Sequence, residues 1–243
     1  MKGIILAGGT GSRLHPLTLV TNKHLLPVYD RPMIYYAIEQ LVGAGLDRIM
    51  IVTGGNDAGD FLRLLGNGSR FGLKHLDYAY QERPGGIAEA LGLAEHFAGG
   101  DAVAVLLGDN IFERSLRPVI EDFRKDPSGA MIVLAELDDP RPYGVAAFEN
   151  GRLTRIVEKP TVPPSKLAVT GLYLYDSDVF DLVRRLRPSA RGELEITDIN
   201  NSYLDRGLMR HATTSGYWAD CGESVNALQH AGRLVADRGA NLA

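Results

Sequence analysis

The sequence has a single cysteine, Cys221, in 243 residues. One thiol excludes an internal disulfide framework and any zinc site that needs several cysteines. The six histidines do not form an H-x-x-x-H pattern or a similar cluster, so they predict no metal centre of their own. We expect Cys221 to be a small buried residue rather than a nucleophile.

A basic excess and a long apolar run are also missing. The chain has 26 Lys and Arg against 30 Asp and Glu, whereas nucleic-acid-binding proteins usually carry a clear positive excess. No apolar stretch approaches the ~20 residues that a membrane span requires, and the run at residues 3–7 is too short for a signal-peptide core. We therefore expect a cytoplasmic protein with no nucleic-acid and no membrane partner.

What the sequence does have is an ordinary globular composition and many glycines. The hydrophobic fraction is 45% and the charged fraction 23%, which is enough apolar surface to bury a sizeable core. Glycine occurs 28 times, well above the usual ~7%. Because these glycines are not periodic, they indicate tight turns and close backbone approaches rather than a fibrous protein.

Hydrophobic patterning predicts alternating strands and helices in the first half of the chain. Expected strands are 3–7, 47–53, 76–80 and 102–107, and expected helices are 32–44, 58–65 and 87–97. This alternation predicts βαβ units and a parallel sheet with helices on both faces.

The second half has a different pattern. Four strand-like segments with short connections follow one another at 130–136, 144–148, 153–158 and 169–175, and a further strand is expected at 209–214. Helices are expected at 179–186, 196–206 and 224–237. The whole predicts an α/β fold, a Rossmann-like, mostly parallel mixed sheet in three αβα layers, whose second half is more antiparallel.

A glycine loop follows the first strand and reads Gly8-Gly9-Thr10-Gly11-Ser12-Arg13. Backbone N–H groups in such a loop can point at a phosphate. The loop is not the dinucleotide fingerprint G-x-G-x-x-G, because Leu14 replaces the last glycine, and it lacks the Gly-Lys-Ser/Thr of a P-loop. Two cations close behind it, Arg13 and Lys23, favour a triphosphate ligand.

Residues 6–18 resemble the signature loop of the sugar-phosphate nucleotidylyltransferases, and residues 23–36 are similar to the glucose-1-phosphate thymidylyltransferases among them. Further matching motifs follow in order: Gln81 with 85–88, then 107–110, 143–145, 158–160, 169–173, 191–198 and 218–220. Each motif is modest evidence, but their joint order covers nearly the whole chain.

The resemblance implies a GT-A-like nucleotidyltransferase fold. It implies one domain over residues 1–243, with a nucleotide-binding half at 1–128 and a sugar-phosphate-binding half at 129–243. The implied reaction takes dTTP and α-D-glucose 1-phosphate to dTDP-glucose and pyrophosphate with Mg²⁺, by direct attack of the sugar phosphate on the α-phosphorus. The resemblance also implies a homo-oligomer.

The resemblance also implies roles for individual residues. The catalytic residues would be Arg13, Lys23, Asp109 and Asp220, of which Asp109 and Asp220 would bind Mg²⁺. Nucleotide contacts would come from Gly8, Gly9, Gly11, Ser12, Arg13, Lys23, Gln81, Gly86 and Asp109, with Gln81 pairing with the thymine. Sugar-phosphate contacts would come from Asn110, Tyr143, Gly144, Glu158, Lys159, Val169, Arg191 and Trp218.

Several alternatives remain open at this point. UTP or another nucleoside triphosphate could replace dTTP, because a pocket discriminates one methyl group by only ~1–3 kcal/mol. A catalytically silent nucleotide-sugar-binding regulator is a further alternative, although the four catalytic positions are all filled. Longer members carry a helical segment after the Trp-x-Asp motif that helps form a feedback site, whereas residues 221–243 follow it here. We therefore expect that site to be absent or altered.

Overall fold

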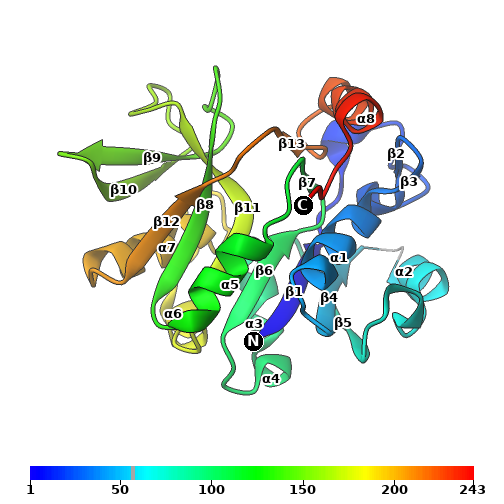
Figure 1. The fold of residues 1–243 in the computed structure, drawn as a ribbon, viewed down its shortest axis with the longest axis horizontal. Helices are drawn as coiled ribbons and strands as arrows, with labels where there is room; N and C mark the ends of the chain where they lie inside the picture. Colours follow the sequence, from blue (N-terminus) through cyan, green and yellow to red (C-terminus); the bar gives the residue numbers. More distant parts are fainter. Residues whose placement is uncertain (56–57) are drawn as a thin grey trace.

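The computed structural model describes residues 1–55 and 58–243. Within these residues, nine strands form the central sheet (Figure 1). The strands are β1 (Lys2–Ala7), β4 (Arg48–Gly54), β5 (His75–Gln81), β6 (Val103–Leu107), β8 (Ala130–Glu136), β9 (Gly144–Glu149), β10 (Arg152–Glu158), β11 (Leu167–Tyr175) and β12 (Met209–Thr213). The main path through the sheet is β10-β9-β11-β6-β1-β4-β5, with β8 pairing with β11 and β12 pairing with β8.

The first half of the chain forms the parallel part of the sheet. Strand β1 lies between β4 and β6, β5 pairs with β4, and all three pairings are parallel. Every residue of β1 is buried, as expected for a strand that is covered on both faces. Because parallel strands end at the same edge, the loops after β1, β5 and β6 meet there, and that edge carries the usual ligand crevice of such sheets.

The second half adds the antiparallel part. Strand β11 runs antiparallel to β6, β8 and β9, and β10 runs antiparallel to β9. Strand β12 returns parallel to β8. The predicted mixed sheet, with a parallel first half and a more antiparallel second half, is confirmed.

Helices cover both faces of the sheet. One apolar core lies under α3 (Ile87–Gly92), α4 (Glu95–Ala98), α6 (Val179–Arg185) and α7 (Ile196–Asp205). The other lies under α1 (Met33–Gly43), α2 (Ala58–Leu65) and α5 (Arg117–Lys125). The three αβα layers expected from the alternating pattern are therefore present.

A smaller group of elements lies beside the central sheet, at the upper right in Figure 1. Strands β7 (Asn110–Phe112) and β13 (Trp218–Asp220) pair antiparallel, and β2 (Pro27–Val28) pairs with β3 (Arg31–Pro32). Helix α8 (Val225–Arg238) packs on both pairs through a third apolar core that includes the fully buried Cys221. Short 3-10 turns occupy Ser12–Leu14, Lys23–Leu25 and Ser69–Phe71.

The structure departs from the sequence predictions at a few short elements. The single helix expected at 87–97 is two helices, α3 and α4, and the sequence analysis predicted no element where α5, β7 and β13 lie. In the described part of the chain, no helix has both the length and the apolar character needed to cross a membrane.

Candidate active site

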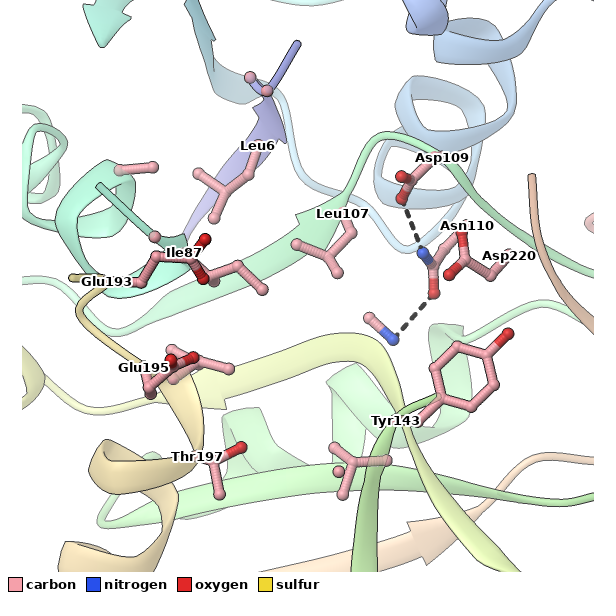
Figure 2. Close-up of a pocket in the computed structure, with 18 of the residues that line it drawn as sticks. Leu6, Ile87, Leu107, Asp109, Asn110, Tyr143, Glu193, Glu195, Thr197 and Asp220 are labelled. Atoms are coloured by element: carbon pink, nitrogen blue, oxygen red, sulfur yellow. Dashed lines mark hydrogen bonds between the residues drawn. The ribbon is translucent and has the colours of Figure 1, made fainter. Parts of the chain in front are cut away.

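A cleft of about 350 Å³ opens at the carboxyl edge of the parallel strands. Most of the residues that the sequence predicted for the site line it: Gly8, Gly9, Arg13, Lys23, Gln81, Gly86, Asp109, Asn110, Tyr143, Gly144, Glu158, Lys159, Val169, Arg191, Trp218 and Asp220. Figure 2 shows the cleft with the carboxylates of Asp109 and Asp220 at one end and those of Glu193 and Glu195 at the other.

Two predicted nucleotide residues, Gly11 and Ser12, are not among the residues that line the cleft. Gly11 has a left-handed backbone with a φ of 62°, and the Thr18 hydroxyl donates a hydrogen bond of 2.7 Å to its carbonyl oxygen. An added Cβ at Gly11 would lie 3.0 Å from Thr18 Cγ2. In this structure Gly11 therefore shapes the loop, and the loop places the exposed Arg13 on the rim of the cleft.

Lys23 and Asp109 form a buried ion pair at the floor of the cleft. Lys23 Nζ lies 2.5 Å from Asp109 Oδ2, and the side chains are only 12% and 11% exposed. Burial alone would raise the pKa of Asp109, but the positive charge of Lys23 and hydrogen bonds from Lys23 and Asn110 outweigh it. The pKa of Asp109 therefore lies well below its ordinary value, and the carboxylate is ionised throughout the neutral range.

Asp220 lies beside this pair because β13 and β7 are neighbours. Asp220 is paired with Asn110 across the two strands, and the Cys221 amide donates a 2.9 Å hydrogen bond to the Asp109 carbonyl oxygen. Burial, followed by the negative charge of Asp109, raises the pKa of Asp220 to about 7. Two carboxylates thus share one buried region with one adjacent ammonium group.

The two carboxylates of Asp109 and Asp220 fit a divalent cation whose other ligands are not protein side chains. Among the described residues no group of three or more His, Cys, Asp and Glu side chains could hold a metal ion. Mg²⁺ typically takes one or two carboxylates together with phosphate and water oxygens. Asp109 and Asp220 offer two carboxylates in the same cleft as the glycine-loop residues Gly8 and Gly9. A cation between them would also relieve the repulsion that raises the pKa of Asp220.

The amide of Asn110 connects three segments around these carboxylates. Its nitrogen donates to Asp109 Oδ1 at 2.9 Å, and its oxygen accepts from Gly171 N at 2.9 Å and from Trp218 Nε1 at 2.6 Å. Figure 2 shows two of these bonds. Since a carboxamide has two N–H donors, one N–H remains for the sugar contact that the sequence predicts for Asn110.

The predicted sugar side is built on the β9–β10 hairpin. Gly144 is paired with Glu158, and Lys159 N donates to the Tyr143 carbonyl oxygen at 3.0 Å. Lys159 has a φ of 42°, a left-handed backbone that costs a non-glycine residue ~1–2 kcal/mol. Such strain is common at ligand-binding positions.

Arg191 stands among three carboxylates on this side. Its guanidinium lies 2.9 Å from Glu195 and within 3.5 Å and 3.6 Å of Glu158 and Glu193. The sequence analysis assigned no role to Glu193, Glu195 or Thr197, although all three line the cleft. The signal was available, since these residues lie in the 191–198 motif, of which only Arg191 was used.

Thr197 contacts the predicted sugar-binding carboxylate directly. Its hydroxyl donates to Glu158 Oε2 at 2.6 Å, which fixes the carboxylate and leaves its other oxygen facing Lys159 and Arg191. Tyr143 and Trp218 also line the cleft, with ring centroids 4.9 Å apart in an edge-to-face arrangement.

The predicted nucleobase side lies at the end of β5. Gln81 Nε2 donates to the Gly86 carbonyl oxygen at 3.3 Å and to Glu89 Oε1 at 3.1 Å. Gly86 has a φ of 100°, and an added Cβ would lie 2.5 Å from the Leu194 carbonyl oxygen. Glycine is therefore required at position 86 by the close approach of the Leu194 backbone.

The chain matches a known protein family over nearly its whole length. The family described as nucleotidyl transferase matches residues 2–238. The chain belongs to the nucleotidyl transferase family. A glucose-1-phosphate thymidylyltransferase of Actinoplanes sp. is 47% identical over 94% of this chain and 76% of the relative. The enzyme of the same name from Neisseria meningitidis is 46% identical over 86% of this chain and 73% of its own.

Solved structures of this family superpose closely. A Bacillus anthracis protein, crystallised with sucrose under the provisional name glucose-1-phosphate thymidylyltransferase, is 52% identical, with a TM-score of 0.93 over 98% of this chain and 96% of its own. A UDP-glucose pyrophosphorylase bound to UDP-glucose is 26% identical, with a TM-score of 0.83 over 97% and 98% of the two chains.

These matches confirm the resemblance to glucose-1-phosphate thymidylyltransferases and the nucleotidyltransferase fold. This member of the nucleotidyl transferase family is an enzyme of the nucleotidyltransferase type, and its activity is sugar-phosphate nucleotidyl transfer.

Proposed function

We propose that the enzyme transfers the thymidylyl group of dTTP to α-D-glucose 1-phosphate, with Mg²⁺ bound by Asp109 and Asp220. The observation that carries the proposal is the meeting of Lys23, Asp109 and Asp220, from three distant segments, between the glycine loop and the Glu158–Lys159 corner. Two relatives are named glucose-1-phosphate thymidylyltransferase. That name supports glucose 1-phosphate and dTTP as the substrates.

The reaction is a direct displacement at phosphorus. A phosphate oxygen of the sugar forms a new bond to the α-phosphorus of dTTP, the bond from that phosphorus to the bridging oxygen breaks, and pyrophosphate leaves. The attacking phosphate is already ionised near neutral pH, so the site needs no general base. The main tasks are positioning and neutralising two anions that repel each other.

The residues divide these tasks along the cleft. Lys23, held by Asp109, would contact the α-phosphate that is transferred, and Arg13 on the rim would hold the β- and γ-phosphates of the leaving pyrophosphate. Lys159 and Arg191 would hold the sugar phosphate, and Glu158 would accept hydrogen bonds from the sugar hydroxyls. A divalent cation on Asp109 and Asp220 would supply further charge neutralisation at the triphosphate.

Arg191 would have to change partners during catalysis. In the structure its guanidinium pairs with Glu195 at 2.9 Å, and a dianionic phosphate would compete for the same donors, because Arg binds phosphate in a forked geometry. Before the sugar phosphate binds, the Glu195 carboxylate would hold the guanidinium in place.

The nucleotide could instead be UTP, and the similarity to a UDP-glucose pyrophosphorylase favours this as the second candidate. The two bases differ by a single methyl group, so the expected discrimination is only ~1–3 kcal/mol.

The proposal is tested by identifying the product. The protein is incubated with glucose 1-phosphate, Mg²⁺ and dTTP, and phosphorus NMR follows the signals of dTDP-glucose and pyrophosphate. Both signals should appear in equal amounts, and EDTA should stop them. Hydrolysis of dTTP without formation of a nucleotide sugar would contradict the proposal.

A further inference from the structure

The side-chain amide of Gln81 has a fixed orientation in the structure. Its nitrogen faces the Gly86 carbonyl oxygen at 3.3 Å and the Glu89 carboxylate at 3.1 Å. Both partners only accept hydrogen bonds, so the amide nitrogen must face them. The oxygen Oε1 then faces the glycine loop, where an added Cβ at Gly8 would lie 3.0 Å from it.

Glu89 accepts hydrogen bonds from two side chains, those of Gln81 and Arg83. Its second carboxylate oxygen lies 3.3 Å from Arg83 Nε, and its side chain is 21% exposed. The carboxylate lies directly over Gly85, where an added Cβ would clash with it. The glycine at 85 therefore leaves room for the carboxylate that fixes Gln81.

We propose that Glu89 is a positioning residue that sets nucleobase specificity by forcing Gln81 to present an acceptor to the base. The inference rests on the proposed function, in which Gln81 faces the thymine. Thymine and uracil carry a donor at N3, whereas the N3 of cytosine is an acceptor. We place Gln81 Oε1 opposite N3 of the base and not opposite C4, where the cytosine amino group would also donate to it. At N3 the fixed acceptor pairs with the first two bases and meets an acceptor in the third, an arrangement that costs affinity.

The carboxylate is the part of this arrangement that prevents the amide from rotating. If the Gln81 amide turned by half a turn, its oxygen would face the Glu89 carboxylate and the Gly86 carbonyl, and both hydrogen bonds would become repulsions. A neutral glutamine at position 89 could offer either a donor or an acceptor. It would therefore allow both orientations of Gln81, one of which suits cytosine.

The test is the variant Glu89→Gln, compared with wild type for dTTP and dCTP. Binding of each nucleotide is measured by calorimetry without sugar phosphate, and kcat/KM for each is measured with glucose 1-phosphate. The ratio of dTTP to dCTP should fall by at least about 10-fold, which corresponds to one neutral hydrogen bond. The KM for glucose 1-phosphate should not change.

The matched control is Glu95→Gln. This residue on α4 is half exposed and pairs with Arg184, so the same chemical change at this position should leave the nucleotide ratio at the wild-type value. Thermal melting of each variant reports folding, and Glu89→Met provides a second variant, which should lower the ratio in the same way.

An equal loss for both nucleotides, or an unchanged ratio, would overturn the assignment, because a merely structural role moves both together. A wild-type protein that binds dTTP and dCTP equally would also overturn it. If the wild type prefers dTTP in binding but forms no nucleotide sugar, the proposed function fails. The binding ratio of the variant then decides the inference independently.

Discussion

At the scale of single residues, the structure explains how two aspartates in one cleft acquire opposite properties. Asp109 has an ammonium partner at 2.5 Å and its pKa is lowered, whereas burial, followed by the charge of Asp109, raises the pKa of Asp220. A buried carboxylate is stable when paired and unstable beside another carboxylate. The two side chains should therefore respond in opposite ways to neutralisation.

We predict that Asp109→Asn destabilises the protein and Asp220→Asn stabilises it. The first change leaves Lys23 without its main partner, which should lower the free energy of unfolding by about 3 to 5 kcal/mol. The second removes a buried negative charge that lies beside another, that of Asp109. Both should lower kcat by at least about 100-fold. Urea unfolding at pH 8 in EDTA measures the stabilities, and shifts of the same sign in both variants would contradict the account.

Arg191 should act on the sugar substrate alone. Arg191→Ala removes a cation near Glu158 and Lys159 but leaves the glycine loop intact. The KM for glucose 1-phosphate should rise at least about 10-fold, while the KM for dTTP should stay within about twofold. Initial rates with each substrate varied in turn provide the measurement, and a rise confined to dTTP would place Arg191 at the triphosphate instead.

His24 should make the fold sensitive to acid. Burial, followed by the charge of Lys23, lowers its pKa to about 3, so below about pH 6.5 the unfolded chain takes up a proton that the folded chain does not. This group therefore lowers stability as pH falls from 6.5 towards 3. The effect amounts to about 1.4 kcal/mol for each pH unit.

The variant His24→Gln should lack this component. The difference in the free energy of unfolding between variant and wild type should change by about 1–2 kcal/mol between pH 6 and pH 4.5, in favour of the variant at low pH. Chemical unfolding at several pH values measures it. A difference that stays constant over this range would mean that His24 is protonated in the folded protein.

At the scale of elements, the long buried strands could be predicted and the short ones could not. Residues 102–107 are an unbroken apolar run, and β6 occupies Val103–Leu107. Strands β7 and β13 have only three residues each, too few for a periodic signal. Yet these two strands place Asn110 and Asp220 side by side, so geometry that is central to the site depends on elements that local patterning does not detect.

The turn after β13 should also be sensitive to substitution, because it packs against the charged residues. An added Cβ at Gly222 would clash with Asp109 Oδ2 and lie 2.8 Å from Lys23 Nζ. Gly222→Ala should therefore lower kcat by about 10-fold or more by displacing this pair. The matched control is Gly232→Ala in α8, where the nearest neighbour, Tyr29 N, is 3.7 Å away.

The control should keep wild-type activity and gain up to about 1 kcal/mol in stability, because alanine is the better helix former. Initial rates measure the activity of both variants, and thermal melting measures their stability. Full activity in Gly222→Ala would show that the Lys23–Asp109 pair tolerates displacement.

At the scale of the whole molecule, the motifs identified the cleft more completely than they identified its internal contacts. The predicted residues come from segments between Gly8 and Asp220, and most of them line one cavity. The motifs could not show which side chains hold these polar groups. Asp109 and Trp218 bond the amide of Asn110, Glu89 bonds the amide of Gln81, and Thr197 bonds Glu158. The Thr197–Glu158 and Trp218–Asn110 contacts depend on tertiary packing between distant segments.

The central claim is that residues of this cleft transfer the thymidylyl group of dTTP to glucose 1-phosphate. The most direct test is the rate of pyrophosphate release with glucose 1-phosphate, Mg²⁺ and, in separate reactions, dTTP, UTP, dCTP, ATP and GTP. The account predicts that dTTP reacts fastest, that UTP follows within the ~10- to 200-fold that one methyl group allows, and that the other three react far more slowly. Fastest release with a purine nucleotide, or none with any of the five, would contradict the account.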